Sequence, residues 1–281
     1  MHYGLTQKAI VVAISSVYYS VAIFINTTTF PAITRTTTSP IRIKAGVFHW
    51  YREKPRLREA YRENARRYAS RANAANETVC IIDLFFFAGR HHLDVSPSKE
   101  FVSENGTNAD MFKGDVDEGH GGGKLFSMLD FVEENWPEYD YFIKMDLDVA
   151  VDWHFLCQNL GNLTRSDNIY FGRSNRLNCG PYGHCPPTMC LDFDKDCWMF
   201  HSGGLVGLSK PLVSKLHVLP NMAREGMHDW MLGQWVKEVS KNHEITVVHY
   251  QNGYAWCHFK PIDFAFMSGR RSIREKSDCS K

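Results

Sequence analysis

Three apolar runs, each long enough for a strand and without regular polar alternation, restrict the folds open to this chain. They are residues 79–89 (VCIIDLFFFAG), 139–151 (YDYFIKMDLDVAV) and 244–250 (EITVVHY). Strands with one face in water alternate polar and apolar residues, whereas strands of a parallel sheet are covered on both faces and have continuous apolar sequences. The chain is therefore expected to contain a sheet with helices on both sides.

Helical segments separate these runs. Residues 52–71 are rich in Arg, Glu and Ala, and residues 124–136 carry an apolar stripe at helical spacing. A short helix is expected after Ser209, a favoured N-cap residue, because Pro211 then falls in its first turn. A further helix is expected at 228–239, and further strands at 41–48 and 169–172. This alternation predicts an α/β fold with a mainly parallel central sheet, which binds ligands at the carboxyl ends of its strands.

The N-terminal segment 9–25 (AIVVAISSVYYSVAIFI) contains no charged side chain. A helix of this length is near the lower limit for crossing a bilayer. Lys8 precedes it and the next positive residue is Arg35, so the charge bias favours a cytoplasmic N-terminus. A cleaved signal peptide is the alternative. The expected organisation is a cytoplasmic tail at 1–8, a membrane signal-anchor at 9–25, a Thr/Pro-rich stem at 26–40 and a catalytic body at 41–281.

The composition favours the secretory pathway. The chain has eight cysteines and sequons at Asn76, Asn105 and Asn162. Disulfides are typical of an oxidising compartment. Zinc near His184 is the alternative for the cysteines, although the chain has no C-x-x-C pair. The net charge of +1 argues against a nucleic-acid partner, which needs a basic surface.

Asp-x-Asp pairs are candidate metal sites, and one of them stands out. Asp146 and Asp148 are flanked by apolar residues on both sides, and alternation in a strand places residues i and i+2 on one side. Two carboxylates together suit Mn²⁺ or Mg²⁺; a pair of salt-bridged or capping acids is the alternative. The pair Asp115/Asp117 is expected in a loop, and the overlapping pairs within 192–196 are expected in a solvated or weakly ion-binding loop.

Four short segments of the body match the motifs of one enzyme family in order and spacing. They are 56–61 (RLREAY), 144–148 (KMDLD), 198–204 (WMFHSGG, followed by Leu208 and Ser209) and 228–233 (HDWMLG). They are similar to R-x-x-I-R-x-T-W, K-x-D-D-D, Y-C-S-G-G-G-Y-V-L-S and E-D-V-x-x-G. Over residues 41–258 the chain thus resembles glycosyltransferase family 31, the β-1,3-galactosyltransferase and Fringe-like group. Tyr61, Leu147 and His228 depart from the family pattern, which indicates a divergent member.

The resemblance implies a GT-A fold and a single-pass type II Golgi membrane protein with a luminal catalytic domain. It also implies inverting transfer of a sugar from a UDP-sugar donor to a glycan or glycoprotein acceptor, with Mn²⁺ or Mg²⁺ as cofactor. A GT-A transferase of another, possibly retaining, family is one alternative. A catalytically silent luminal glycan-binding protein is another.

The resemblance also assigns roles to single residues. Asp229 matches the catalytic base, and Asp146 and Asp148 match the metal-binding acids. His249 is the first choice for an added histidine ligand of the metal, and His258 the second. The residues expected to bind the nucleotide sugar are Arg58, Lys124, Asp146, Ser202, Gly203 and Gly204.

Overall fold

The computed structural model describes residues 22–24, 39–49, 55–75, 80–90, 100–104, 107–117, 123–146, 149–179, 197–219, 228–250 and 256–258. The helices are α1 Pro55–Ala75, α2 Lys124–Asn135, α3 Trp153–Leu160, α4 Lys210–His217 and α5 His228–Ser240. The strands are β1 Ala22–Phe24, β2 Ile41–His49, β3 Cys80–Arg90, β4 Glu100–Glu104, β5 Thr107–Asp117, β6 Tyr141–Asp146, β7 Val149–Val151, β8 Ile169–Cys179, β9 Cys197–Ser209, β10 Thr246–His249 and β11 Trp256–His258.

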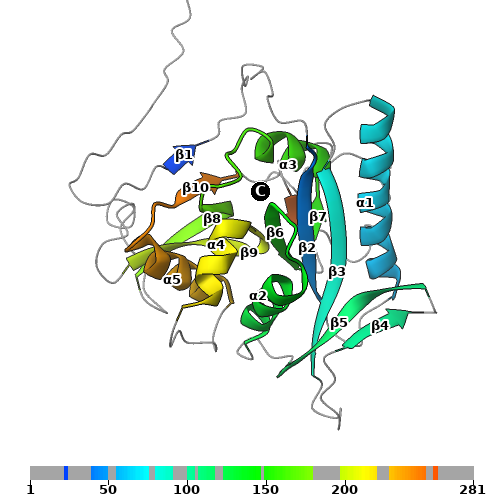
Figure 1. Ribbon diagram of the computed structural model, residues 1–281, viewed down its shortest axis with the longest axis horizontal. Helices are drawn as coiled ribbons and strands as arrows, with labels where there is room; N and C mark the ends of the chain where they lie inside the picture. The colour runs from blue at the N-terminus through cyan, green and yellow to red at the C-terminus, as the bar shows by residue number, and fades with distance from the viewer. Residues whose placement is uncertain are drawn as a thin grey trace, which may run out of the picture.

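The central sheet has nine strands in the order β1-β10-β8-β9-β6-β2-β3-β5-β4 (Figure 1). Five of its strand pairs are parallel: β1 with β10, β10 with β8, β6 with β2, β2 with β3, and β3 with β5. β9 runs antiparallel between β8 and β6, and β4 is antiparallel to β5. The predicted α/β fold with a mainly parallel sheet is therefore confirmed.

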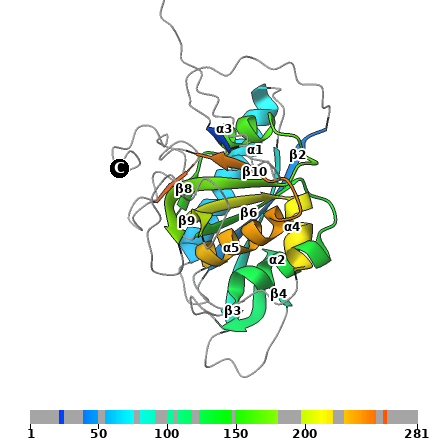
Figure 2. The ribbon, with the colours of Figure 1, turned by 90° about the vertical axis from the view of Figure 1, so that its left-hand side faces the viewer.

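Helices cover both faces of this sheet, as the continuous apolar runs predict. One apolar cluster joins one face to α1 and α3, and a second joins the other face to α2, α4 and α5. Figure 2 shows α2, α4 and α5 together on their side of the sheet. Along β6, Tyr141, Ile143 and Met145 belong to the first cluster and Phe142 to the second. Because side chains alternate along a strand, Lys144 and Asp146 face the α5 side together with Phe142.

Most predicted elements occur close to their expected positions. The exceptions lie in polar or irregular sequence. Asp115 and Asp117 belong to strand β5, so the prediction of a loop there is wrong. Ser209 is the N-cap residue of α4 but makes no capping hydrogen bond; its hydroxyl donates to the Asp167 carbonyl and accepts from the Ile169 amide. The acidic stretch 192–196 lies outside the described residues.

The predicted membrane segment is only partly described. Its residues Ala22–Phe24 form β1 and pair in parallel with β10, which departs from the helix expected for them. Residues 1–21 and 25–38 lie outside the described part of the chain, so the anchor itself stays a prediction. Among the described helices, none combines the length and the hydropathy needed to cross a bilayer.

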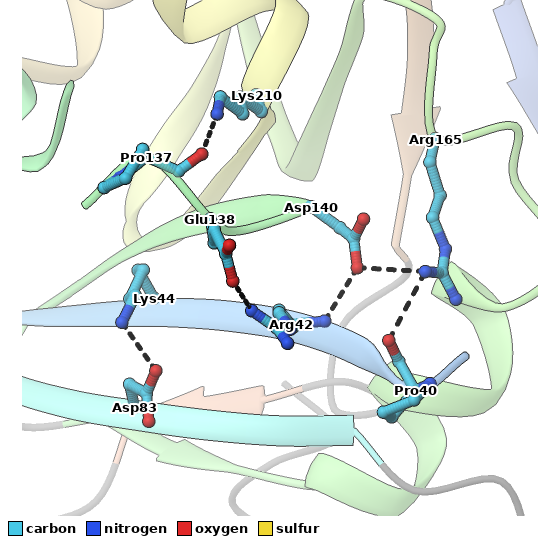
Figure 3. Close-up of polar contacts among 9 residues, drawn as sticks. All are labelled: Pro40, Arg42, Lys44, Asp83, Pro137, Glu138, Asp140, Arg165 and Lys210. Atoms are coloured by element: carbon cyan, nitrogen blue, oxygen red, sulfur yellow. Dashed lines mark hydrogen bonds and ion pairs between the residues drawn. The ribbon is translucent and has the colours of Figure 1, made fainter.

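A polar cluster holds the end of the sheet at which strands β2 and β6 begin (Figure 3). The Asp140 carboxylate accepts the Arg42 amide at 2.8 Å and forms an ion pair with Arg165 at 3.2 Å. The Asp140 backbone donates to the Arg42 carbonyl and accepts from the Lys210 amide at the start of α4. This edge is therefore held by structural contacts, and the carboxyl ends of β2 and β6 lie at the opposite edge.

A disulfide joins Cys80, at the start of β3, to Cys157 in α3, with 6.0 Å between the Cα atoms. The expectation of disulfides is thus confirmed for this pair.

The register between β8 and β9 predicts a second disulfide. Cys179 and Cys197 are Cα partners at the end of this antiparallel ladder. Directly paired residues have Cα atoms about 4.5–5.5 Å apart, which lies within the range that a disulfide needs. Non-reducing peptide mapping should recover the Cys179 and Cys197 peptides linked to each other, alongside the Cys80–Cys157 pair. Recovery of either cysteine as a free thiol, or linked elsewhere, would contradict this pairing.

Candidate active site

A buried lysine joins two of the predicted site acids at the carboxyl edge of the sheet. The Nζ atom of Lys144 lies 2.7 Å from Oδ1 of Asp146 and 3.4 Å from Oδ1 of Asp229. The lysine side chain is 4% exposed, whereas the Asp146 and Asp229 side chains are 36% and 22% exposed. The ammonium group is therefore enclosed, while both carboxylates keep a face toward solvent.

The local sequence explains this arrangement. Lys144 and Asp146 are two residues apart on β6 and point to the same face of the sheet. Asp229 lies in the first turn of α5, where the helix dipole stabilises a negative charge. Burial lowers the pKa of Lys144, but the nearby carboxylates of Asp229 and Asp146 outweigh it and leave this pKa above its usual value. Lys144 is therefore a fixed positive charge between the two acids.

Phe48, near the carboxyl end of β2, forms the apolar wall beside this cluster. Its ring centroid lies 4.9 Å from Nζ of Lys144 and 5.3 Å from Nζ of Lys124. The His228 ring contacts it edge-on, with 5.1 Å between centroids. Lys124 is buried at the first position of α2, so the structure brings this predicted nucleotide-binding residue to the same edge as Asp146.

Tyr61 of α1 holds the end of β6 at Asp146 and the start of β7 at Val149 from the opposite face of the sheet. The Tyr61 hydroxyl accepts a hydrogen bond from the Val149 amide at 3.0 Å, and it lies within donating distance of two carbonyl oxygens, that of Asp146 at 2.9 Å and that of Val149. It therefore fixes both ends of the segment that contains Leu147 and Asp148, two residues outside the described part of the chain. Arg58 is buried one turn earlier on the same helix.

The glycine-containing segment of β9 begins beside Asp146. The ladder between β6 and β9 ends at the pair Met145 and Leu205, so Asp146 and Gly204 are the next residues along the two strands. Gly204 is buried, and Ser202 and Gly203 precede it in β9. The structure thus places the backbone of all three predicted sugar-binding residues at or near the site.

The two candidate histidine ligands lie at different distances from Asp146 and Val149. His249 lies on β10, three strands from β6, and pairs in register with Gly172. At about 4.8 Å per strand this is about 14 Å across the sheet. Burial lowers the pKa of His249 to about 4, so its imidazole is neutral at pH 7. His258 lies on β11, and its Cα is the partner of Val149, one residue after Asp148.

The site also contains residues whose importance the sequence did not reveal. Lys144 was noted only as the first residue of its motif, and Tyr61 only as a departure from a tryptophan. The contact of Lys144 with Asp229 and the contacts of Tyr61 with Asp146 and Val149 join residues 85 and 88 positions apart, and no local pattern signals such contacts.

The residues at this edge fit a divalent cation with few protein ligands. Asp146 supplies a partly exposed carboxylate, a hard oxygen ligand. Within the described ranges, no three or more His, Cys, Asp or Glu side chains are grouped so that they could hold a metal ion. Mg²⁺ and similar hard cations suit such a site, because they keep water ligands and bind substrate phosphates.

No family model and no curated protein matches this sequence. Among solved structures, the chain is similar to the bifunctional glycosyltransferase WbbM, at 11% identity and a TM-score of 0.40, with 77% of this chain and 40% of WbbM covered. The chain thus spans less than half the length of WbbM.

Two other structures have similar scores. A mutant Drosophila β-1,4-galactosyltransferase 7, solved with manganese, UDP-Gal and xylobiose, is 11% identical with a TM-score of 0.40, covering 84% of this chain and 76% of that chain. The inositol-1-phosphate CTP transferase from T. maritima is 10% identical with a TM-score of 0.39, covering 83% and 96%. Likenesses at these scores assign no activity, so the function has to be argued from the residues of the site.

The contacts of Tyr61 predict a measurable loss of stability when its hydroxyl is removed. Tyr61→Phe removes the hydrogen bonds between this hydroxyl and the backbone of Asp146 and Val149, and it should lower the free energy of unfolding by about 1–3 kcal/mol. Tyr68→Phe is the matched control on the same helix, because its buried hydroxyl accepts from the Cys80 amide at the longer distance of 3.3 Å. Urea denaturation of both variants measures the difference. An equal loss of unfolding free energy in both variants would contradict this role of the Tyr61 hydroxyl.

Proposed function

We propose that this chain is a metal-dependent glycosyltransferase that moves a sugar from a nucleotide-sugar donor to a hydroxyl group of an acceptor. The observation that carries the proposal is the Lys144 ammonium group between Asp146 and Asp229. It holds an acid suited to the metal and donor beside an acid suited to proton removal. Both lie at the carboxyl edge of the sheet, where α/β folds bind ligands.

The reaction divides between the two acids. Asp229 accepts the proton of the acceptor hydroxyl while that oxygen attacks the anomeric carbon of the donor. The bond between the anomeric carbon and the diphosphate oxygen breaks, and the diphosphate leaves with the electron pair. A metal ion held by Asp146 and Asp148 would supply Lewis-acid stabilisation of that leaving group. A single displacement of this kind inverts the anomeric configuration.

The cationic residues support a nucleotide on the donor side. Lys124, at the start of α2, lies beside the Phe48 ring. Arg58 is buried on α1, one helical turn before Tyr61. Both would bind phosphate or nucleotide oxygens. The backbone of Ser202, Gly203 and Gly204 would approach the sugar, since glycine leaves room for such an approach.

The finer assignment is a divergent, inverting member of glycosyltransferase family 31 with a GT-A fold, a UDP-sugar donor, Mn²⁺ or Mg²⁺, and a glycan or glycoprotein acceptor. It is supported by the four sequence motifs, because their described residues Asp146, Gly204 and Asp229 converge on one edge of the sheet. The hydrogen bond from the Tyr61 hydroxyl to the Asp146 carbonyl adds to this support, because it joins the first motif (56–61) to the second (144–148).

We propose that the catalytic body lies in the lumen of the Golgi or secretory pathway and is attached to the membrane by the predicted N-terminal anchor. The Cys80–Cys157 disulfide supports an oxidising compartment. Asn162 of the third sequon is exposed in the turn after α3, where a glycan could be attached.

Substitution of the base tests the reaction. Asp229→Asn should reduce kcat by about 10²–10⁴-fold, because the amide cannot accept the proton. Donor binding should change little, because the proposed role of Asp229 is to contact the acceptor hydroxyl. Glu238→Gln is the control on the same helix, because Glu238 forms an exposed pair with Lys241. The assay measures UDP release from a panel of UDP-sugars with Mn²⁺, and NMR of the product gives the anomeric configuration. Near-normal turnover in Asp229→Asn would refute the base assignment.

The choice between the two histidines can also be tested. We favour His258 as the metal ligand, because its backbone pairs with Val149, the residue that follows Asp148. His258→Ala should weaken Mn²⁺ binding at least tenfold in calorimetry, whereas His249→Ala should leave it nearly unchanged. The reverse result would assign the ligand to His249.

A further inference from the structure

The Lys144 ammonium group interacts with the carboxylate that the proposed metal needs. Its Nζ atom lies 2.7 Å from Oδ1 of Asp146, in hydrogen-bonding contact. A divalent cation would bind a carboxylate oxygen at about 2.0–2.2 Å. A metal on Asp146 and the ammonium group of Lys144 would thus lie within about 5 Å of each other. Two cations would then compete for one carboxylate.

We propose that Lys144 is an internal cation that competes with the divalent metal for Asp146, so that the metal binds tightly only together with the anionic diphosphate of the donor. This inference rests on the proposed function and deepens it, because it specifies the order in which metal and donor occupy the site. Lys144 acts here as a positioning residue for the metal and the base.

The position of Lys144 prevents it from simply moving away. Its side chain is 4% exposed, the Asp229 carboxylate lies 3.4 Å away, and the Phe48 ring is beside it. In an enclosed site of this kind solvent and salt screen charges weakly. Lys124, whose Nζ lies on the same ring, adds a second positive charge to the neighbourhood. A metal ion that enters alone therefore meets repulsion from nearby fixed cations.

A nucleoside diphosphate changes this balance. Its negative charges attract both the metal and the ammonium group, so the repulsion between the two cations is compensated in the ternary complex. Without metal and donor, the ammonium group also offsets part of the negative charge of Asp146 and Asp229 and holds both carboxylates in place. Metal binding and diphosphate binding should therefore be synergistic, and the synergy should depend on the charge of residue 144.

Direct Mn²⁺ binding tests the inference without any turnover. Calorimetry or the EPR signal of free Mn²⁺ is measured for the wild-type chain and for Lys144→Met, each with and without UDP. The wild type should bind Mn²⁺ weakly alone and at least tenfold more tightly with UDP. Lys144→Met should bind Mn²⁺ alone at least tenfold more tightly than the wild type, and should gain less from UDP.

Three further variants separate charge from packing. Lys144→Arg keeps the charge and should behave as the wild type, whereas Lys144→Gln removes it but can still donate a hydrogen bond to a carboxylate. Lys44→Met is the matched control, because Lys44 pairs with Asp83 at 2.6 Å and lies over the Trp136 ring. Lys44→Met should leave Mn²⁺ binding unchanged, and thermal unfolding confirms that each variant is folded.

The inference is overturned if neither neutral variant of Lys144 binds Mn²⁺ more tightly than the wild type, including the case in which none of the proteins binds it. It is also overturned if Lys144→Arg gains as much affinity as Lys144→Met. The proposed function fails by a different observation, namely that the wild type releases no UDP from any UDP-sugar and transfers no sugar.

Discussion

The buried Lys144 charge is the interaction on which the organisation of this site depends. An ammonium group removed from water costs several kcal/mol unless charged and hydrogen-bonding partners compensate it. Here the compensation comes from Asp146 on the same strand and Asp229 on α5. The pairing therefore fixes where α5 begins relative to β6. Loss of either acid would leave a buried charge with only one of these carboxylates beside it.

Glycines on neighbouring strands leave room for the side chains that pack on this face of the sheet. Gly46 on β2 and Val206 on β9 are the register partners of Lys144. A Cβ atom on Gly46 would lie 2.7 Å from Met128 and Phe85, so a larger residue there would push against the α2 side of the core. On β8, Gly172 gives the same space to His201, whose Cβ and Cγ a Cβ atom there would meet at 2.8 and 2.9 Å. Glycine in these strands thus serves close packing on the face that carries the site.

The sequence predicts the helices and strands that have a clear local residue pattern. It does not predict the strands that form only because a neighbouring strand pairs with them. β2, β3, β6 and β10 were predicted because continuous apolar residues mark buried strands, and α2 and α5 because their periodicity is helical. β5 was missed because its polar sequence gives no strand pattern. Most of β9 was missed because it is irregular and gains its ladder only from β6 and β8. The spacing of the acids predicted them as site residues, whereas the contact of Lys144 with Asp229 and that of Tyr61 with Asp146 join residues distant in sequence.

Asp146 is held from both faces of the sheet, and this accounts for a precise site at the end of a strand. Lys144 binds its carboxylate on the α5 face, and the Tyr61 hydroxyl binds its carbonyl on the α1 face. A strand end held on one side only could rotate its last peptide and move the carboxylate. With both groups fixed, the chain leaves β6 at Asp146 in one orientation, and the proposed metal and donor site would require rigid placement of this kind. The tyrosine at position 61, where the motif R-x-x-I-R-x-T-W has tryptophan, then has a structural consequence. Its hydroxyl both accepts from the Val149 amide and donates to a backbone carbonyl, whereas an indole N–H can only donate.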